Sequence, residues 1–275
     1  MNYRYGKNVF LTGGSSGIGL ATAELFAENG YTVFAASRNP NMKVRSFPGG
    51  GEIRPIKLDV CDPRSVKKAA ESVLSQADIG IVIHSAGLGI ACPAEEFPED
   101  AIERLMETNF TSILRINSHF LPHLRNRKSG LCIMISSVAS IFPIPFQSHY
   151  CSSKAAIDSY AAALRMELYK YKVKVSLLLP GDTHTGFTSA RSYDILDSSP
   201  YYGTCINAVR KMEKDELGGR LPISAARKVY KLSMKRNPPL RTIVGFDYKL
   251  LAFVRRFLPD KLTEKILKSM YIGRE

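Results

Sequence analysis

The sequence lacks the features that mark secreted, membrane-spanning and metal-binding proteins. Its five cysteines are scattered, odd in number and without a Cys-x-x-Cys pair, which argues against both a disulfide framework and a zinc site. No uncharged apolar run reaches the roughly 18 residues that a membrane span needs. The first seven residues contain polar and charged side chains but no apolar signal core. We therefore expect a cytoplasmic protein whose thiols are reduced.

Length and composition are those of an ordinary globular chain, except for the distribution of charge. With 275 residues, of which 45% are hydrophobic and 23% charged, the chain is long enough for one large domain. Residues 210–275 contain 17 Lys+Arg against 7 Asp+Glu, so +10 of the net charge of +13 lies in this last quarter. Because the first 200 residues are close to neutral, we expect no nucleic-acid-binding surface over the domain.

Short apolar runs alternate with longer segments of helical periodicity, which is typical of βαβ units. The runs are apolar at nearly every position, as strands buried on both faces are. We therefore predict an α/β protein built on a doubly wound parallel sheet flanked by helices. It forms a single domain, with residues 1–190 as the core and residues 191–275 as a lid and C-terminal helical extension. The predicted strands are 9–12, 32–36, 56–59, 79–84, 131–136 and 173–179, and the predicted helices are 20–29, 65–76, 101–124 and 149–168.

A glycine-rich segment, TGGSSGIG at residues 12–19, lies between the first predicted strand and the first predicted helix. In this place glycines let the backbone approach a pyrophosphate, and the helix N-terminus supplies amide donors and a positive dipole. The alternative is a plain tight turn, for which glycine is also common. The position between strand and helix favours nucleotide binding. The predicted binding residues of this segment are Gly13, Ser15, Ser16, Gly17, Ile18 and Gly19.

The end of the second strand indicates which nicotinamide cofactor is bound. An acidic side chain there accepts hydrogen bonds from a ribose 2′-hydroxyl and repels a 2′-phosphate. This chain has Ser37 and Arg38 instead, which suit a phosphate and predict NADP (NADPH) as the cofactor; the alternative is that Arg38 is a solvated loop residue. After the third predicted strand, Asp59 and Val60 are placed to reach the adenine. For Asp59 the alternative is a helix cap before Pro63.

Tyr150 and Lys154 are four positions apart on the predicted helix 149–168. Residues at this spacing share one helix face, so the two side chains project into the same space. A neighbouring ammonium stabilises a phenolate and lowers the tyrosine pKa, which suits a proton donor to a carbonyl. The spacing alone proves little, because Tyr3 and Lys7 share it before any strand has begun.

Ser137 supplies the context that the spacing lacks. It follows the strand 131–136, so its hydroxyl and the Tyr150 helix converge on the crevice where doubly wound sheets bind ligands. Together with the glycine-rich loop, this combination resembles the short-chain dehydrogenase/reductase family over about residues 7–190. The resemblance implies a Rossmann-type fold.

The resemblance also implies catalytic roles. Tyr150 would be the general acid/base, Lys154 the residue that adjusts its pKa and binds the nicotinamide ribose, and Ser137 the residue that orients the substrate oxygen. Asn109 would be the asparagine of the proton relay. The alternatives are that Asn109 is a polar residue inside a helix and that Ser137 caps the end of its strand.

Two further segments are implied to bind the cofactor. Where the family usually has Asn-Asn-Ala-Gly, this chain has His84-Ser85-Ala86-Gly87, so Ala86 and Gly87 are kept while the hydrogen bonds of two asparagines are lost. His84 or Ser85 is expected to replace those bonds, since a lone histidine at a strand end is more often structural than catalytic. The loop at residues 180–185 resembles the family's nicotinamide loop, with Pro180, Gly181, Thr183 and Thr185 as its binding residues.

The function that this pattern predicts is an NADP(H)-dependent oxidoreductase that interconverts a ketone and a secondary alcohol on an apolar, lipid-like substrate. The length of the segment after residue 185 resembles hydroxysteroid and retinol dehydrogenases, so a hydroxysteroid or bile acid is the expected substrate. Retinoids, long-chain lipid ketones, a sugar-nucleotide epimerase or dehydratase, and a catalytically silent NADP sensor are the alternatives. Residues 186–221 are either a lid over the substrate or a packed helix pair without substrate contact.

Residues 248–271 place Leu, Phe, Ile and Val between Lys and Arg at helical spacing, with a break at Pro259. A basic amphipathic helix of this kind lies on an anionic membrane surface, which predicts peripheral membrane contact. The alternative is a helix that packs its apolar side on the domain or on a second subunit. The family resemblance implies a homodimer or homotetramer formed through helices 101–124 and 149–168.

Overall fold

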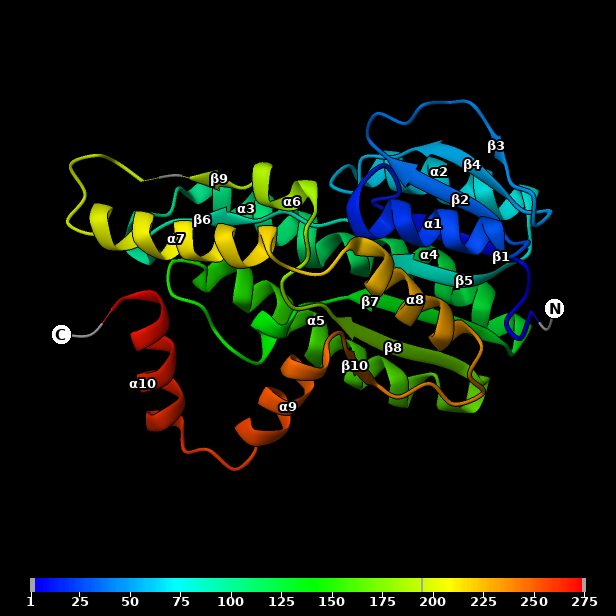
Figure 1. The fold of residues 1–275 in the computed structure, drawn as a ribbon. Helices are drawn as coiled ribbons and strands as arrows, with labels where there is room; N and C mark the ends of the chain where they lie inside the picture. Colours follow the sequence, from blue (N-terminus) through cyan, green and yellow to red (C-terminus); the bar gives the residue numbers. More distant parts are fainter. Residues whose placement is uncertain (1–2, 194, 274–275) are drawn as a thin grey trace.

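An eight-stranded sheet organises the chain in the computed structural model, which describes residues 3–193 and 195–273 (Figure 1). Its order is β10-β8-β7-β5-β1-β2-β4-β3, and neighbours are parallel except for the short β3, which is antiparallel to β4. A second, two-stranded parallel sheet joins β6 (Ile90–Ala91) to β9 (Ser192–Tyr193). The main-sheet strands are β1 (Asn8–Thr12), β2 (Thr32–Ser37), β3 (Arg45–Ser46), β4 (Glu52–Lys57), β5 (Ile79–His84), β7 (Gly130–Ile135), β8 (Val173–Leu179) and β10 (Arg241–Ile243).

Helices cover both faces of the sheet. Alternate residues of each strand point to opposite faces, so each face carries apolar side chains that a layer of helices buries. In β1, Val9 and Leu11 enter the core that α1 (Gly17–Glu28) and α8 (Pro222–Ser233) cover. Phe10 enters the opposite core, where its ring stacks on Phe120 with centroids 4.4 Å apart. Figure 1 shows the two layers. The helices of the second face are α2 (Pro63–Gln76), α4 (Ser112–Arg127) and α5 (Ser148–Glu167).

The remaining helices do not cover the faces of the main sheet. Two of them, α9 and α10, come after the last strand, β10. α9 and α10 lead away from β10, and α10 turns back toward α7 (Figure 1). None of the helices in the described part of the chain is long and apolar enough to span a membrane. These remaining helices are α3 (Glu99–Met106), α6 (Gly186–Ser189), α7 (Tyr202–Leu217), α9 (Phe246–Arg255) and α10 (Asp260–Tyr271).

The predicted Rossmann-type sheet is confirmed, although several elements differ in detail and the two-residue strands β3, β6 and β9 were not predicted. The third predicted strand, 56–59, lies earlier, at β4 (Glu52–Lys57), because its backbone pairs with β2 along its whole length. The predicted helix 101–124 is two helices separated by a π-helical turn at Glu107–Thr111. β10 was not predicted, because its residues Arg-Thr-Ile are too few and too polar to give a strand signal.

His84, at the end of β5, is a buried polar residue that joins the sheet to α4. Its Nε2 lies 2.9 Å from the Oδ1 of Asn117, whose Nδ2 donates to the Tyr160 hydroxyl at 3.1 Å. His84 therefore supplies a hydrogen bond between sheet and helix, as expected of a residue that replaces a bracing asparagine. Burial lowers the pKa of His84 to about 4, and the hydrogen bond to Asn117 opposes this shift only in part.

The neutral imidazole of His84 predicts acid sensitivity. Its folded-state pKa is about 4 and its ordinary value is 6.5, so the unfolded chain binds the proton more readily. Its contribution to stability is complete above pH 6.5 and is lost as the pH falls toward 4. Between pH 7 and pH 5 we expect the wild type to lose roughly 2 kcal/mol more unfolding free energy than His84→Asn in urea titrations. His119→Asn, a half-buried histidine change on α4, is the control, and equal losses in all three proteins would contradict the prediction.

Candidate active site

A cleft of about 840 Å³ lies at the carboxyl ends of the parallel strands. Parallel sheets place their ligands at this edge, since the loops that follow the strands meet there. Every residue predicted to bind the cofactor lines this cleft, as does Ser137. The set comprises Gly13, Ser15, Ser16, Gly17, Ile18, Gly19, Ser37, Arg38, Asp59, Val60, Ala86, Gly87, Tyr150, Lys154, Pro180, Gly181, Thr183 and Thr185.

The glycine-rich loop has the geometry of a phosphate cradle. Gly13 has a φ of +71° and Gly17 a φ of +52°, values that favour glycine. A Cβ on Gly19 would lie 2.0 Å from the Gly13 carbonyl oxygen, so only glycine allows this close turn. The N-cap of α1, Ser16, makes no side-chain cap hydrogen bond, and the first turn contains no acidic residue. The first amides of α1 therefore remain available to a pyrophosphate, which fits a dinucleotide.

Where the cleft passes the ends of β2 and β4, its wall contains the cationic side chain of Arg38 and the exposed carboxylate of Asp59. Arg38 follows β2 directly and is exposed, with Ser37 beside it. Asp59 holds its own turn, because its Oδ1 accepts from the Cys61 amide at 3.0 Å. The cap of α2 is instead Asp62, which accepts from the Arg64 amide at 2.9 Å. Asp59 is therefore not the helix cap, and its carboxylate lies in the cleft wall.

Tyr150 and Lys154 lie one turn apart on α5, and the Lys154 Nζ is 5.6 Å from the centre of the Tyr150 ring. Nζ donates to the Ile135 carbonyl oxygen at 3.1 Å. Burial lowers the pKa of Lys154 to about 8, against a smaller opposing effect of Asp158. Burial also raises the pKa of Tyr150 above its ordinary value, while a hydrogen bond with Ser137 lowers it. The predicted lowering of the phenol pKa is therefore not seen in the protein alone, because desolvation exceeds the effect of its neighbours.

Ser137 and Asn109 have distinct positions relative to the cleft. Ser137 lines it and also caps the short helical turn at 138–140, because its Oγ accepts from the Ala139 amide at 3.1 Å. Asn109 lies on the π-helical turn and is fully buried. Its Oδ1 accepts from the Leu88 amide at 2.7 Å, and its Nδ2 donates to the Leu88 carbonyl at 2.9 Å and to Ser153 at 3.0 Å. The Asn109 side chain thus holds the loop after β5 against α5 and does not line the cleft.

A network that the sequence did not reveal lies beneath Lys154. Asp158 is buried one turn further along α5 and accepts from the Ser136 hydroxyl at 2.6 Å and the Ser140 hydroxyl at 3.1 Å. Arg241 of β10 donates to the same carboxylate at 3.2 Å. The network binds β7, α5 and the edge strand together under the site. Its only sequence signal was the spacing of four between Lys154 and Asp158.

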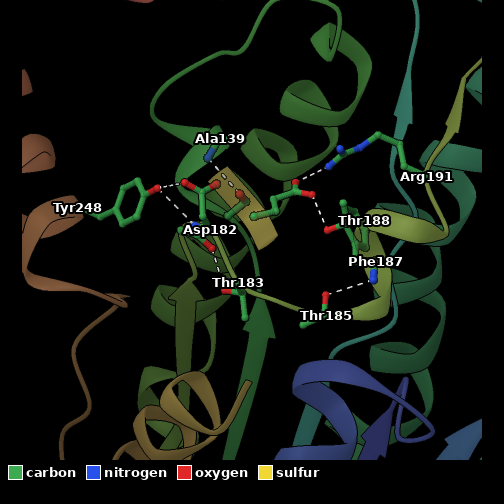
Figure 2. Close-up of polar contacts among 11 residues, drawn as sticks. Ala139, Asp182, Thr183, Thr185, Phe187, Thr188, Arg191 and Tyr248 are labelled. Atoms are coloured by element: carbon green, nitrogen blue, oxygen red, sulfur yellow. Dashed lines mark hydrogen bonds and ion pairs between the residues drawn. The ribbon is translucent and has the colours of Figure 1, made fainter. Parts of the chain in front are cut away.

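The loop after β8 is held by α9 (Figure 2). The Tyr248 hydroxyl donates to the Asp182 carboxylate, and a Cβ on Gly181 would lie 2.1 Å from the Tyr248 ring. Within the loop, Thr183 donates to the Gly181 carbonyl at 2.8 Å, and Thr185 accepts from the amide of Phe187 at 3.1 Å. The two threonine side chains therefore fix the backbone of this wall of the cleft.

An ion pair between the buried Arg191 and the partly exposed Glu216 was also missed in the sequence. Arg191 donates to the Glu216 carboxylate, whose other oxygen accepts from Thr188 at 2.7 Å (Figure 2). Arg191 and Glu216 both line the cleft beside Phe187, whose ring centre is 5.9 Å from that of Tyr150. No motif announces this pair, because its members come from α7 and from the loop after α6.

The segment 186–221 has features of both predicted arrangements, the lid over the substrate and the packed helix pair. Phe187 lines the cleft, as expected of a lid residue. By contrast, Val209 and Met212 lie on the buried face of α7, which is the packed arrangement. Tyr201 and Tyr202 are each more than a third exposed, and Ile206 is half-buried. The side chain of Tyr193, an aromatic residue of the same segment, lies outside the described part of the structure.

Comparison with known proteins identifies the family. The model of the short chain dehydrogenase family matches residues 7–195. The chain is a short-chain dehydrogenase/reductase. It is 33% identical over 270 residues to a 3-ketodihydrosphingosine reductase of Bacteroides thetaiotaomicron, with 97% of this chain and 98% of that protein covered. It is 32% identical over 189 residues to human 17-beta-hydroxysteroid dehydrogenase type 1, with 65% and 57% covered.

Solved structures of this family share the fold. A short-chain dehydrogenase from Streptomyces avermitilis superposes with a TM-score of 0.81 at 23% identity, covering 96% of this chain and 95% of that one. A Burkholderia cenocepacia short-chain dehydrogenase in complex with NADP has a TM-score of 0.74 at 22% identity, covering 95% and 98%. As a member of this family the chain is an oxidoreductase that uses a nicotinamide cofactor.

The buried ammonium of Lys154 predicts that the stability of the cofactor-free protein rises with pH. Its folded-state pKa is about 8 against an ordinary 10.5, so the unfolded chain holds the proton more tightly and the cost is complete below pH 8. This cost is relieved as the pH rises from 8 to 10.5. Relative to Lys154→Met, the wild type should gain roughly 2 kcal/mol of unfolding free energy between pH 7 and pH 9.5.

The control for this measurement is Lys68→Met, which changes an exposed lysine on α2. Denaturant titrations at both pH values give the unfolding free energies. A wild type that gains no more than Lys154→Met between the two pH values would show that the ammonium of Lys154 is not significantly desolvated.

Proposed function

We propose that this short-chain dehydrogenase/reductase uses NADPH to reduce the ketone of a long-chain lipid to a secondary alcohol. The observation that carries the proposal is the similarity to a 3-ketodihydrosphingosine reductase, which extends over 97% of this chain and 98% of that protein. Similarity over that length includes the segment 186–221, of which Phe187, Arg191 and Glu216 line the cleft, as well as α9 and α10. The position of Phe187 beside Tyr150 supports an apolar substrate.

In this proposal Tyr150 donates its phenolic proton to the carbonyl oxygen, and the Ser137 hydroxyl holds the same oxygen by a hydrogen bond. A bound nicotinamide cofactor supplies the hydride for the carbonyl carbon. Lys154, fixed on the Ile135 carbonyl, keeps a positive charge beside the phenolate that remains and binds the nicotinamide ribose. Asn109 acts as a positioning residue that fixes the loop after β5.

NADPH is the proposed cofactor because of the charge at the end of β2. Arg38 and Ser37 provide a guanidinium and a hydroxyl for a 2′-phosphate, and the tip of β2 has no carboxylate that would repel one. Asp59 and Val60, in the adjacent wall, are the proposed neighbours of the adenine.

A hydroxysteroid is the second candidate substrate. The observation that favours it is the 32% identity to human 17-beta-hydroxysteroid dehydrogenase type 1, which covers 57% of that protein. A rigid steroid and a flexible chain both bury apolar surface, so the walls of the cleft alone do not choose between them. The long-chain lipid is preferred because its relative matches over the full length.

The main test follows absorbance at 340 nm with NADPH or NADH and a panel of 3-ketodihydrosphingosine, keto-steroids, keto-bile acids and retinal. We expect the long-chain ketone to be reduced with NADPH preferred. Tyr150→Phe should lower kcat by at least about 100-fold, because it lacks the acidic proton, and should still bind NADPH. Turnover of a steroid alone would replace the lipid by the second candidate. Binding of NADPH without any turnover would favour a cofactor sensor.

We propose further that α9 and α10 bind the surface of an anionic membrane. Residues 246–271 contain six Lys+Arg against three Asp+Glu. The apolar side chains between these charges lie in water, where a packed helix would bury them. A surface that is both basic and apolar suits a bilayer with anionic lipids. The most exposed apolar residues are Phe246 (80%), Leu250 (51%), Leu251 (53%), Phe253 (58%) and Phe257 (73%).

Vesicle sedimentation tests this contact. The protein should sediment with vesicles of phosphatidylserine and phosphatidylcholine, and about tenfold less with phosphatidylcholine alone, because anionic lipid attracts the basic residues. Phe253→Glu with Phe257→Glu should abolish sedimentation, whereas Tyr169→Glu, an equally exposed aromatic after α5, should not. Absence of sedimentation would contradict the proposal. A dimer in light scattering that dissociates only in the double variant would assign the surface to a second copy.

A further inference from the structure

The ion pair of Arg191 and Glu216, in the cleft beside Tyr150, has hydrogen-bond donors that the protein itself does not use. The Arg191 side chain is 1% exposed and the Glu216 side chain 17% exposed. One guanidinium nitrogen, Nη2, donates to Glu216. The other two, Nε and Nη1, are buried and have no hydrogen-bond partner. Leaving buried donors of a charged group unpaired is destabilising, so this arrangement calls for an acceptor from outside the chain.

The pair lies where a substrate would meet it. Arg191, Glu216, Phe187 and Tyr150 line one cleft. The Arg191 Cζ lies 5.9 Å from the centre of the Phe187 ring, and that ring centre is 5.9 Å from the centre of the Tyr150 ring. The unpaired donors therefore belong to the part of the cleft next to the phenol that is proposed to protonate the ketone.

We propose that Arg191 and Glu216 form a subsite for a polar amino-alcohol head group next to the ketone of a lipid substrate. In this subsite Arg191 donates to the hydroxyl oxygen and Glu216 accepts from the ammonium. The inference rests on the proposed reduction of a long-chain lipid ketone and specifies the head group that distinguishes the substrate from a simple ketone.

The charge of the pair selects this class of ligand. A carboxylate or phosphate would find donors on Arg191 but would be repelled by Glu216 at the same place. A steroid skeleton or a plain alkyl chain would leave both donors unpaired. An amino alcohol offers an oxygen acceptor and a cation together, so each half of the pair gains a partner and neither charge is left isolated.

Thr188 keeps the carboxylate in place for this role. Its hydroxyl donates to one Glu216 oxygen while Arg191 binds the other. Both oxygens keep a further lone pair, so Glu216 can still accept from an ammonium. Because the carboxylate is already oriented, binding the head group does not require the side chain to be ordered.

Binding and kinetics with matched ligands test the subsite. The ligand pair for calorimetry is a short-chain 2-amino-1,3-diol and a secondary alcohol of equal chain length. The substrate pair is 3-ketodihydrosphingosine and octadecan-3-one. The wild type should bind the amino diol, and reduce the amino ketone, about 10- to 100-fold better than the simple partner of each pair. This preference should disappear in Arg191→Met with Glu216→Met, because kcat/KM should fall by a larger factor for the amino ketone than for octadecan-3-one.

Glu216→Gln and a surface variant make the result specific. Glu216→Gln keeps the shape and removes the charge, so it should lower the affinity for the amino diol about tenfold with NADPH binding intact. Lys211→Met with Asp215→Met removes an ion pair on the same helix, α7, and should retain the full preference. Thermal unfolding and NADPH titration confirm that each variant is folded.

Two results separate this inference from the proposed function. A wild type that reduces both ketones equally well, or variants that lose both activities in equal proportion, would overturn the subsite and leave lipid-ketone reduction standing. A wild type that reduces neither ketone would overturn the proposed function, and the subsite with it.

Discussion

One buried ammonium sets the layout of the site. Lys154 donates to the carbonyl of Ile135, the last residue of β7, and this contact fixes α5 over the end of the strand at the height that puts Tyr150 in the cleft. Desolvating the ammonium is costly, as its pKa of about 8 indicates. Asp158 is the compensating charge, and it is itself held by Ser136, Ser140 and Arg241. The edge strand β10 is therefore part of the electrostatic support of the active site.

The two buried cations of the cleft are compensated in different ways. Lys154 has its carboxylate one helical turn away, and its ammonium donates instead to the Ile135 carbonyl, 5.6 Å from the centre of the Tyr150 ring. Arg191 contacts its carboxylate directly, which neutralises the pair as a unit. The ammonium of Lys154 therefore leaves a positive field where a phenolate would form. The pair of Arg191 and Glu216 has no net charge, but it leaves hydrogen-bond donors of Arg191 unpaired. In the proposed function, the place where charge develops is therefore separate from the place where the amino-alcohol head group would bind.

The sequence alone was sufficient to predict the parts of the molecule that depend on short, periodic or conformationally unusual segments. The buried strands are continuous apolar runs, and the glycine-rich loop contains positions such as Gly19 that admit no Cβ, so both could be recognised without the fold. Arg191 and Glu216 could not, because they are 25 positions apart and only the fold brings them together. The direction in which the pKa of Tyr150 is shifted also could not be predicted, since the shift depends on desolvation by residues distant in the chain.

The C-terminal helices are tied to the cleft by Tyr248. Its ring packs on Gly181, where a Cβ would lie 2.1 Å from the ring, and its hydroxyl binds Asp182, which lines the cleft. The Pro-Gly turn is therefore constrained by packing as well as by backbone conformation. Because α9 starts at this contact, the exposed apolar and basic surface of α9 and α10 is joined directly to a wall of the active site. A movement of α9 on binding a bilayer would reach the loop at 180–185 through Tyr248 and also through Arg220, which pairs with Asp247 of α9 and whose backbone bonds Asp182 and His184.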